Sequence, residues 1–472
     1  MVRGFLLAVT VFFRRFPLLS ALPSEDVAGG LALPSEDVVG GLALPSERGA
    51  EGIMNVQFEM LPKNCWQLWL CCSLMYVGLR PPSGCMSSVY CSDLKNKGEW
   101  SELYTLFKLL SDQNLYPIEK NQIDGERLRL PILSIMRYID QDISVEYLIM
   151  EDSNINMNIN NEEQRVVEKS DFSYWAKQLF AEMSSIKKKD ASFAIPSLND
   201  FRGKTCCPKV ACVNRKIADN CKDKSDLYIV IHDTLTGQTP KQGFSIKSEI
   251  GSAPTLVNAS LLTNFHYRLT NPLTQDQIDF VNNMVVKQGN KSVTDVMGRL
   301  AKIKELGSEL EFCGIQQNKN NEDVFLENLI LVDSCMPQIL AWLLRTSFST
   351  GERRIDKLTE MITKANPMRF PMTVNTKHYE AKVKRLLMDF ALGMLPSQPW
   401  EATDLASGVL VVKPSGNIDC YHVLYKDTLE EYLYHDLKFE TASATIHDFA
   451  SIKSDSYGNQ YFTLNLQLRF IQ

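Results

Sequence analysis

The 472-residue sequence lacks any run of 18 uninterrupted apolar residues, and a helix that crosses a bilayer needs about 20. A membrane-spanning protein is therefore not expected. Cysteine is too sparse for a small disulfide-stapled secreted scaffold, because only 12 are spread over the whole chain. Reduced thiols in a cytoplasmic protein are the expectation. An excess of positive charge is also missing, since 50 Lys and Arg face 56 Asp and Glu. This balance excludes a uniformly basic, histone-like protein.

Hydrophobic residues make up 44% of the chain and charged residues 22%, so a chain of this length can bury a substantial core. Residues 1–92 differ from the rest. The tetrapeptide Leu-Pro-Ser-Glu begins at Leu22, Leu33 and Leu44 with a period of 11, which is too short for a solenoid repeat of 20 or more residues. We interpret this leader as an extension upstream of the true start, with Met86 as initiator; a membrane-directed segment or a disordered arm is the alternative.

The remaining chain mixes helical and strand patterns. Trp100, Leu103, Phe107 and Leu110 have the spacing of one helical face. Further helices are expected at 130–138, 171–183 and 427–439, and the Asn-rich segment 154–161 is expected to be an exposed loop. Strands are expected at 409–412 and 418–425, joined as a hairpin, and at 461–470. We divide the ordered chain into a core at 93–275, a mainly helical section at 276–388 and a C-terminal α+β section at 389–472; the residues described next make the core a candidate catalytic unit.

Two expected strands carry the most informative pair of side chains. Residues 227–231 and 243–248 are rich in β-branched and aromatic residues, and a turn-like segment joins them. Asp226 precedes the first strand, and Lys247 lies on the second, on the face opposite Phe244 and Ile246. A carboxylate that holds a divalent cation beside a lysine that stabilises negative charge suggests phosphodiester hydrolysis. The alternative is an ordinary edge strand with an exposed lysine.

Several separated motifs, in the same order along the chain, resemble the HpaII-type restriction endonucleases from residue 95 to residue 472. The N-terminal motifs are Gly98-Glu99-Trp100-Ser101-Glu102, Ser225-Asp226, Gly243-Phe244-Ser245-Ile246-Lys247-Ser248, Thr255-Leu256-Val257-Asn258-Ala259-Ser260 and Thr263-Asn264-Phe265. The C-terminal motifs are Ala391-Leu392-Gly393-Met394, Pro396-Ser397-Gln398-Pro399-Trp400 and Leu464-Asn465-Leu466-Gln467-Leu468-Arg469-Phe470.

The resemblance implies a Mg²⁺-dependent type II enzyme that cuts double-stranded DNA within the palindrome CCGG. It also implies the restriction-endonuclease fold, an α/β core with a mixed sheet flanked by helices, whose signature is Pro-Asp followed by Asp/Glu-x-Lys. A palindromic target favours a homodimer, and a cognate DNA methyltransferase is expected in the same cell. A DNA-binding relic that has lost cleavage is the alternative.

On the family pattern, Asp226 is the metal-binding acid and Lys247 is the catalytic lysine. The sequence departs from the pattern at two positions. Ser225 replaces the proline, and Ser245 stands at the catalytic position of the second carboxylate. A lone carboxylate holds Mg²⁺ weakly, so another acid is needed. Glu249 on the same strand is one candidate, but we favour Glu99 or Glu102 of the N-terminal helix as the metal ligand; taken alone, these two are simply acids near a helix N-terminus.

Short polar side chains after the lysine are candidates for DNA contact. Thr255, Asn258, Ser260 and Asn264, with the nearby Arg268, offer groups that bond phosphate oxygens and base edges. A capped turn that leads into a helix favours the same residue types and is the equal alternative. Base contacts to G·C pairs are expected from elsewhere, such as the basic stretch 345–385.

Two further groups of residues raise the question of a zinc site and of a general-base site. The cysteines at 206, 207, 212 and 221 lack the spacing of two Cys-x-x-Cys knuckles, so no zinc site is expected. His232 beside Asp233 is the alternative general-base site, although a turn histidine is the simpler interpretation.

Overall fold

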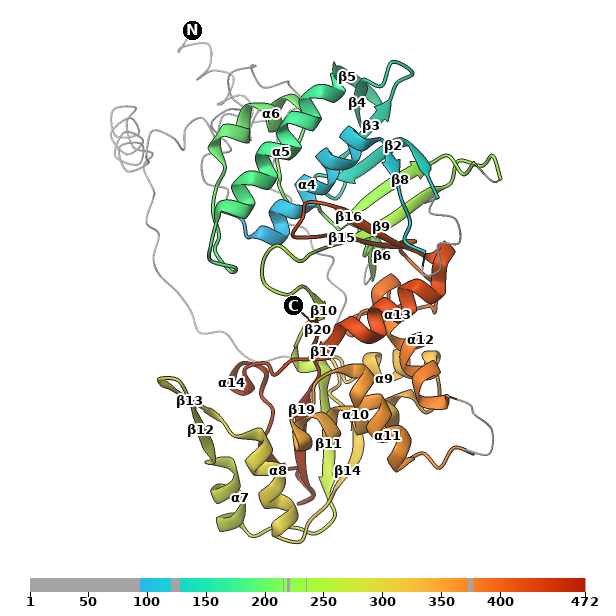
Figure 1. Cartoon of the computed structure of the whole chain (residues 1–472). Coiled ribbons are helices and arrows are strands. Elements are labelled where there is room, and N and C mark those ends of the chain that lie inside the picture. Colours follow the sequence, from blue (N-terminus) through green and yellow to red (C-terminus); the bar gives the residue numbers. More distant parts are fainter. Residues whose placement is uncertain are drawn as a thin grey trace, which may run out of the picture. The chain divides into compact units, whose positions relative to one another are not determined.

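The computed structural model describes residues 94–119, 128–214, 216–218, 221–234, 236–371 and 377–471 (Figure 1). The leader at 1–92, with its repeats and Met86, lies outside these residues. Among the described residues, no single helix is long and apolar enough to cross a membrane. The helices α9 (Val324–Val332) and α10 (Met336–Thr350) pass that test only as a pair, with a bend of 105° between them.

A mixed nine-stranded sheet carries the residues of interest, in the order β16-β15-β9-β8-β2-β3-β4-β5, with β1 paired to β2. These strands span Asn114–Leu115 (β1), Leu130–Tyr138 (β2), Ser144–Ile149 (β3), Ile155–Ile159 (β4), Glu162–Val167 (β5), Leu227–Ile231 (β8), Lys241–Ser248 (β9), Gly408–Val412 (β15) and Ile418–His422 (β16). Strands β9 and β15 run parallel, and the other paired strands in this sheet run antiparallel. The predicted strands 227–231 and 243–248 and the predicted hairpin 409–412/418–425 are confirmed, although the second hairpin strand ends at His422.

Two helices pack on one face of this sheet, α4 (Lys97–Asp112) and α5 (Lys169–Ser185) (Figure 1). The predicted face of α4 is confirmed, because Trp100, Leu103, Phe107 and Leu110 are fully buried. The helix begins at a capping box in which Asn96 and Glu99 each bind the other's backbone N–H. The predicted helix 171–183 lies within α5.

Two predictions in this half of the chain are wrong. Residues 130–138 form the strand β2 rather than a helix, because β3 and β8 hydrogen-bond to its two edges, and a short apolar run does not distinguish helix from strand. The segment 154–161 contains the strand β4 rather than only an exposed loop. Its alternation places Ile155 and Met157 in the core, with asparagines between them.

The rest of the chain combines helices with two smaller sheets and a second hydrophobic core. One sheet joins β10 (Thr255–Val257), β20 (Leu468–Phe470) and β17 (Leu437–Phe439); the other joins β14 (Leu310–Ile315), β11 (Asn264–Leu269), β19 (Gln460–Asn465) and β18 (Ile452–Ser454). The two-stranded pairs are β6 (Lys216–Ala218) with β7 (Cys221–Lys222), and β12 (Val285–Gln288) with β13 (Lys291–Thr294). The remaining helices are α6 (Asn199–Lys204), α7 (Gln275–Asn282), α8 (Val296–Glu305), α11 (Ile355–Ala365), α12 (His378–Leu392), α13 (Lys426–Asp436) and α14 (Ala444–His447).

The section 276–388 is mainly helical as predicted but also holds β12, β13 and β14. The predicted helix 427–439 ends at Asp436 and continues as β17, and the predicted strand 461–470 is divided into β19 and β20. The large sheet draws β15 and β16 from the C-terminal section, whereas β10 and β11 from the 93–275 range pair with C-terminal strands. The boundaries at 276 and 389 therefore do not follow the sheets.

An aromatic cluster fixes α4 and α5 to each other, and it provides a test of this core. The Phe172 ring lies 5.7 Å from that of Phe107 and 5.3 Å from that of Phe201, and it is fully buried. We expect Phe172→Ala to lower the free energy of unfolding by about 3–5 kcal/mol, measured by urea denaturation. Tyr174→Ala on the same helix, where the side chain is 56% exposed, serves as the control and should change it by less than about 1 kcal/mol. Equal losses in the two variants would contradict this packing.

Candidate active site

Asp226 and Lys247 are brought together by the pairing of β8 with β9. Leu227 lies opposite Phe244 in this antiparallel pair, and the Asp226 backbone N–H donates to the Phe244 carbonyl at 2.8 Å. The Asp226 Oδ2 accepts a hydrogen bond from the Ile246 N–H at 2.7 Å. The carboxylate is thus tied to the residue next to Lys247. Burial raises the pKa of Asp226, and the positive charge of Lys247 and the hydrogen bond from Ile246 act against that rise.

Glu102 supplies a second carboxylate from the helix α4. Its Oε2 accepts a hydrogen bond from the Cys212 backbone N–H at 2.5 Å. Burial, together with the nearby charge of Asp226, raises the pKa of Glu102 to about 8. Both carboxylates are half-buried, and the charge of Asp226 disfavours ionisation of Glu102, so a divalent cation would stabilise the charged form of the pair.

The other glutamate of α4 has a different environment. Glu99 takes part in the capping box with Asn96, and its Oε1 lies 3.3 Å from the Lys95 Nζ. A sequence signal for this role was available, because an asparagine three residues before a glutamate at a helix start is the pattern of a capping box. The third candidate, Glu249, pairs with Lys413 at 2.6 Å, just beyond the end of β9.

Ser245 lies on β9 beside Val409 of the parallel strand β15, and it is almost fully buried. Its hydroxyl brings no charge, so it cannot replace a carboxylate as a strong cation ligand. Within the described part of the chain, no group of three or more His, Cys, Asp or Glu side chains is close enough to hold a metal ion. Asp226 and Glu102 are two acids that lie near each other here, and Mg²⁺, which keeps several waters, needs only one or two carboxylates.

Lys224 is a second amine near Asp226 that the sequence analysis missed. Its Nζ donates to the carbonyl of Phe390, in the last turn of α12. Burial, together with the charge of Lys247, lowers the pKa of Lys224 to about 7. No sequence signal marked this residue, because it precedes the strand and its partner lies 166 positions away.

The residues in front of Asp226 fit closely against β9. A Cβ atom on Gly243 would lie 2.1 Å from the Ser225 Oγ, so only glycine fits at this position without a shift. Ser225 occupies the place of the expected proline, and its hydroxyl donates to the Leu405 carbonyl at 3.1 Å. This serine therefore anchors the start of β8 to the segment that leads into β15.

The predicted DNA-contacting residues do not share one environment. Asn264 is 2% exposed, and its amide donates to the His447 carbonyl while its Oδ1 accepts from Asn465. Ser260 caps a short 3₁₀ turn. Arg268 is exposed and lies 3.3 Å from Glu311.

The two remaining candidates differ in exposure. Thr255 is half-buried in β10, whereas Asn258 is exposed. The expected capped turn is present, but it leads into the strand β11 instead of a helix.

Three of the four cysteines considered for zinc are described. Cys206, Cys207 and Cys212 are free thiols, and the side chain of Cys221 lies outside the described residues. Cys212 takes part in the site through its backbone. Burial raises the pKa of its half-buried thiol, and the charges of Glu102 and Asp226 also act to raise it. The alternative site residue His232 follows β8, and its backbone N–H donates to the Pro131 carbonyl.

The chain is similar in sequence to known proteins over the region that contains these residues. The family model described as HpaII restriction endonuclease matches residues 96–470. The chain is 38% identical over 381 residues to the type II restriction enzyme HpaII of Haemophilus parainfluenzae, which covers 80% of this chain and 98% of that protein. No solved structure matches the chain.

The raised pKa of Glu102 gives a pH dependence that can be tested without a divalent cation. An acid whose pKa is raised on folding keeps its proton in the native state while the unfolded chain releases it. Stability is therefore lost as the pH rises from the ordinary value of 4.5 towards about 8. We expect the Tm of the parent to fall more steeply between about pH 5 and pH 7 than that of Glu102→Gln, measured by calorimetry. Identical pH profiles of the two proteins would contradict the buried, protonated state.

Proposed function

This chain belongs to the HpaII restriction endonuclease family, and we propose that it is a Mg²⁺-dependent type II enzyme that cuts double-stranded DNA at CCGG. The observation that carries this proposal is the junction of β8 and β9, where Asp226 is bonded to the residue beside Lys247. This arrangement agrees with the Pro-Asp and Asp/Glu-x-Lys core of restriction endonucleases, with Ser225 and Ser245 at the two altered positions.

In this proposal, Asp226 and Glu102 hold the Mg²⁺ ion. When bound, the ion would supply Lewis-acid stabilisation of the charge that develops on the scissile phosphate. Lys247 places its ammonium group against the same phosphate and stabilises the negative charge of the transition state. Glu102 replaces the carboxylate that Ser245 lacks, because α4 packs directly on β9; the Ser101 hydroxyl donates to the Ser248 hydroxyl at 2.7 Å.

The remaining parts of the proposal follow from the substrate. A twofold symmetric target is most simply cut by a homodimer that presents one site to each strand. Host DNA with the same sequence must be protected, so the proposal includes a cognate DNA methyltransferase. An inactive DNA-binding relic is the alternative, and the observation that favours it is the neutral Ser245 on β9.

Cleavage of a plasmid of known sequence decides between the two functions. With Mg²⁺, we expect discrete fragments whose ends map to CCGG, and with EDTA we expect intact plasmid. Binding to the plasmid without fragments in Mg²⁺ would support the inactive relic. Fragments that end at other sequences would contradict the proposed target but leave the nuclease activity in place.

Lys247 provides the test of the chemistry. We expect Lys247→Ala to slow plasmid cleavage by about 100-fold or more, because it removes a positioned charge from the transition state. Lys241→Ala is the matched control. Lys241 lies at the exposed start of the same strand, so this variant should cut at close to the parent rate. A Lys247→Ala protein that cuts as fast as the parent would end the proposed mechanism.

The two glutamates of α4 provide a second comparison, which identifies the metal ligand. We expect Glu102→Gln to raise the Mg²⁺ concentration needed for half-maximal cleavage by about 10-fold or more, because one carboxylate is lost. Glu99→Gln should leave this Mg²⁺ requirement unchanged, and its amide oxygen can still accept the capping hydrogen bond from the Asn96 N–H. The reverse result would assign the ligand role to Glu99.

A further inference from the structure

Among the described residues, the strands β12 and β13 form a hairpin that pairs with no other strand. Its two strands pair only with each other, from Val285 opposite Thr294 to Gln288 opposite Lys291. All four residues of β12 are exposed, including Val285 at 57% and Val286 at 48%. Figure 1 shows the hairpin extending away from α7 and α8. A hairpin that buries so little of its own surface needs another reason for its position.

A buried arginine holds the base of this hairpin in place. Arg299 of α8 is only 5% exposed, and its guanidinium donates to the carbonyls of Asn282, Met284 and Ala450. The Asn282 amide also bonds to the backbone N–H and carbonyl of Ile452 at 2.7 and 3.0 Å. The hairpin is therefore a projecting arm on a firmly bonded base.

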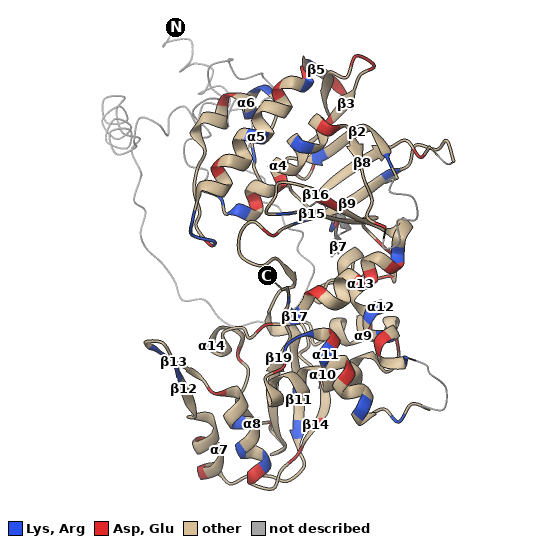
Figure 2. Cartoon of the chain, viewed as in Figure 1, with Lys and Arg blue, Asp and Glu red and all other residues tan. Residues whose placement is uncertain are grey.

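The tip of the arm carries only cationic and neutral polar groups. Its sequence is Lys287-Gln288-Gly289-Asn290-Lys291, and no acidic residue occurs between Asp279 and Asp295. Gly289 has a φ of 59°, a conformation that suits glycine at a tight turn. Figure 2 shows Lys and Arg as blue on the ribbon at this end of the hairpin. Two amides and two amines at one tip are the groups that hydrogen-bond base edges and phosphates.

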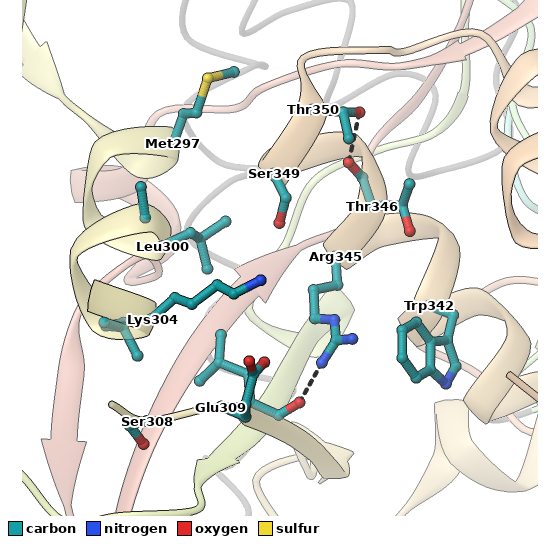
Figure 3. Close-up of a pocket in the computed structure, with 13 residues that line it drawn as sticks. Met297, Leu300, Lys304, Ser308, Glu309, Trp342, Arg345, Thr346, Ser349 and Thr350 are labelled. Carbon is teal, nitrogen blue, oxygen red and sulfur yellow. Dashed lines mark hydrogen bonds between the residues drawn. The ribbon is translucent and has the colours of Figure 1, made fainter. Parts of the chain in front are cut away.

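Positive charge continues on the helix that follows the hairpin. Lys304 of α8 points into a hollow of about 410 Å³ between α8 and α10, together with Arg345 of α10 (Figure 3). The Arg345 guanidinium lies 3.9 Å from the centre of the Trp342 ring and donates to the Leu310 carbonyl at 2.5 Å. One acid, Glu309, lines the same hollow. The hollow is thus weakly cationic, and the hairpin tip is the more strongly charged end of this segment.

We propose that the β12–β13 hairpin enters a groove of the DNA substrate, where Lys287 and Lys291 contact phosphates and Gln288 and Asn290 face the base edges. A two-stranded ribbon has the width that the major groove of DNA admits. The proposal rests on the proposed function, because it takes double-stranded DNA as the substrate. A second copy of the chain is the less suitable occupant, since two lysine-bearing tips repel each other.

The test is equilibrium binding of a CCGG duplex in the absence of Mg²⁺, over a series of salt concentrations. Lys287→Ala/Lys291→Ala should weaken binding by roughly 10-fold, and it should reduce the slope of log K against log[salt] by about one for each lost phosphate contact. Lys302→Ala/Lys438→Ala is the matched control. It removes the same charge from two lysines paired with Glu305 and Glu440, and it should keep the parent slope.

A shortened hairpin tests the ribbon itself. Residues 287–292 are replaced by Asn-Gly, which closes a two-residue turn between Val286 and Val293. We expect loss of specific duplex binding with an unchanged Tm, because the removed residues bury little surface.

Three outcomes would overturn the proposal. The first is parent-like affinity and salt slope in the hairpin variants, and the second is an equal loss in the control. The third is a shortened protein that changes oligomeric state in size-exclusion chromatography, since the hairpin would then bind a second copy. The unmodified protein distinguishes failure of the hairpin proposal from failure of the proposed function. If it cuts DNA, the outcomes above contradict only the hairpin proposal; if it neither binds nor cuts DNA, the proposed function itself fails.

Discussion

The hydrogen bond from the Ile246 backbone N–H to the Asp226 carboxylate is the constraint on which the candidate active site depends. A carboxylate that accepts from the backbone of the neighbouring strand cannot rotate away from it, so Asp226 and Lys247 keep one relative position as long as β8 and β9 remain paired. The same bond stabilises the charge of a carboxylate that burial would otherwise neutralise. The register of β8 and β9 therefore sets both the position of the Asp226 carboxylate and the stability of its charged form.

The support for that register comes from distant parts of the sequence. On one side, α4 lies against β9 and provides Glu102, which is held by the Cys212 backbone. On the other side, β15 runs parallel to β9 and Ser225 bonds to Leu405. Lys224 reaches the last turn of α12, where a cation is favoured by the helix dipole. The site is thus assembled from helices and strands that are far apart in the sequence rather than from one continuous stretch of chain.

Sequence patterns predicted the elements whose signals are local. The helix α4 followed from the spacing of Trp100, Leu103, Phe107 and Leu110, and β8 and β9 followed from β-branched and aromatic runs. The patterns failed where tertiary pairing decides the outcome. The apolar content of 130–138 suits a helix or a strand, and only its pairing with β3 and β8 makes it a strand. The asparagines of 154–161 suggested a loop, whereas Ile155 and Met157 bury one face of β4.

The sequence predicted the parts of the candidate site that are close together in the chain, but not the parts that depend on tertiary packing. Asp226 and Lys247 could be placed on adjoining strands because their separation along the chain is short. Glu99 and Glu102 are one turn apart on α4, and apolar spacing alone does not tell which of them lies near the strands; the capping pattern around Asn96 does. Lys224 and its acceptor at Phe390 could not be paired from sequence, because that contact depends on how α12 packs beside the sheet.

The late position of β15 in the chain has a consequence for biosynthesis. A ribosome completes β9 roughly 160 residues before β15, and until then one backbone edge of β9 has no strand beside it. An unpaired edge of this kind can recruit other chains, so a nascent chain halted before β15 carries Lys247 on an open, association-prone strand. Synthesis of β15 makes that edge available for pairing, so β9 can have both of its neighbouring strands only after most of the chain has been made.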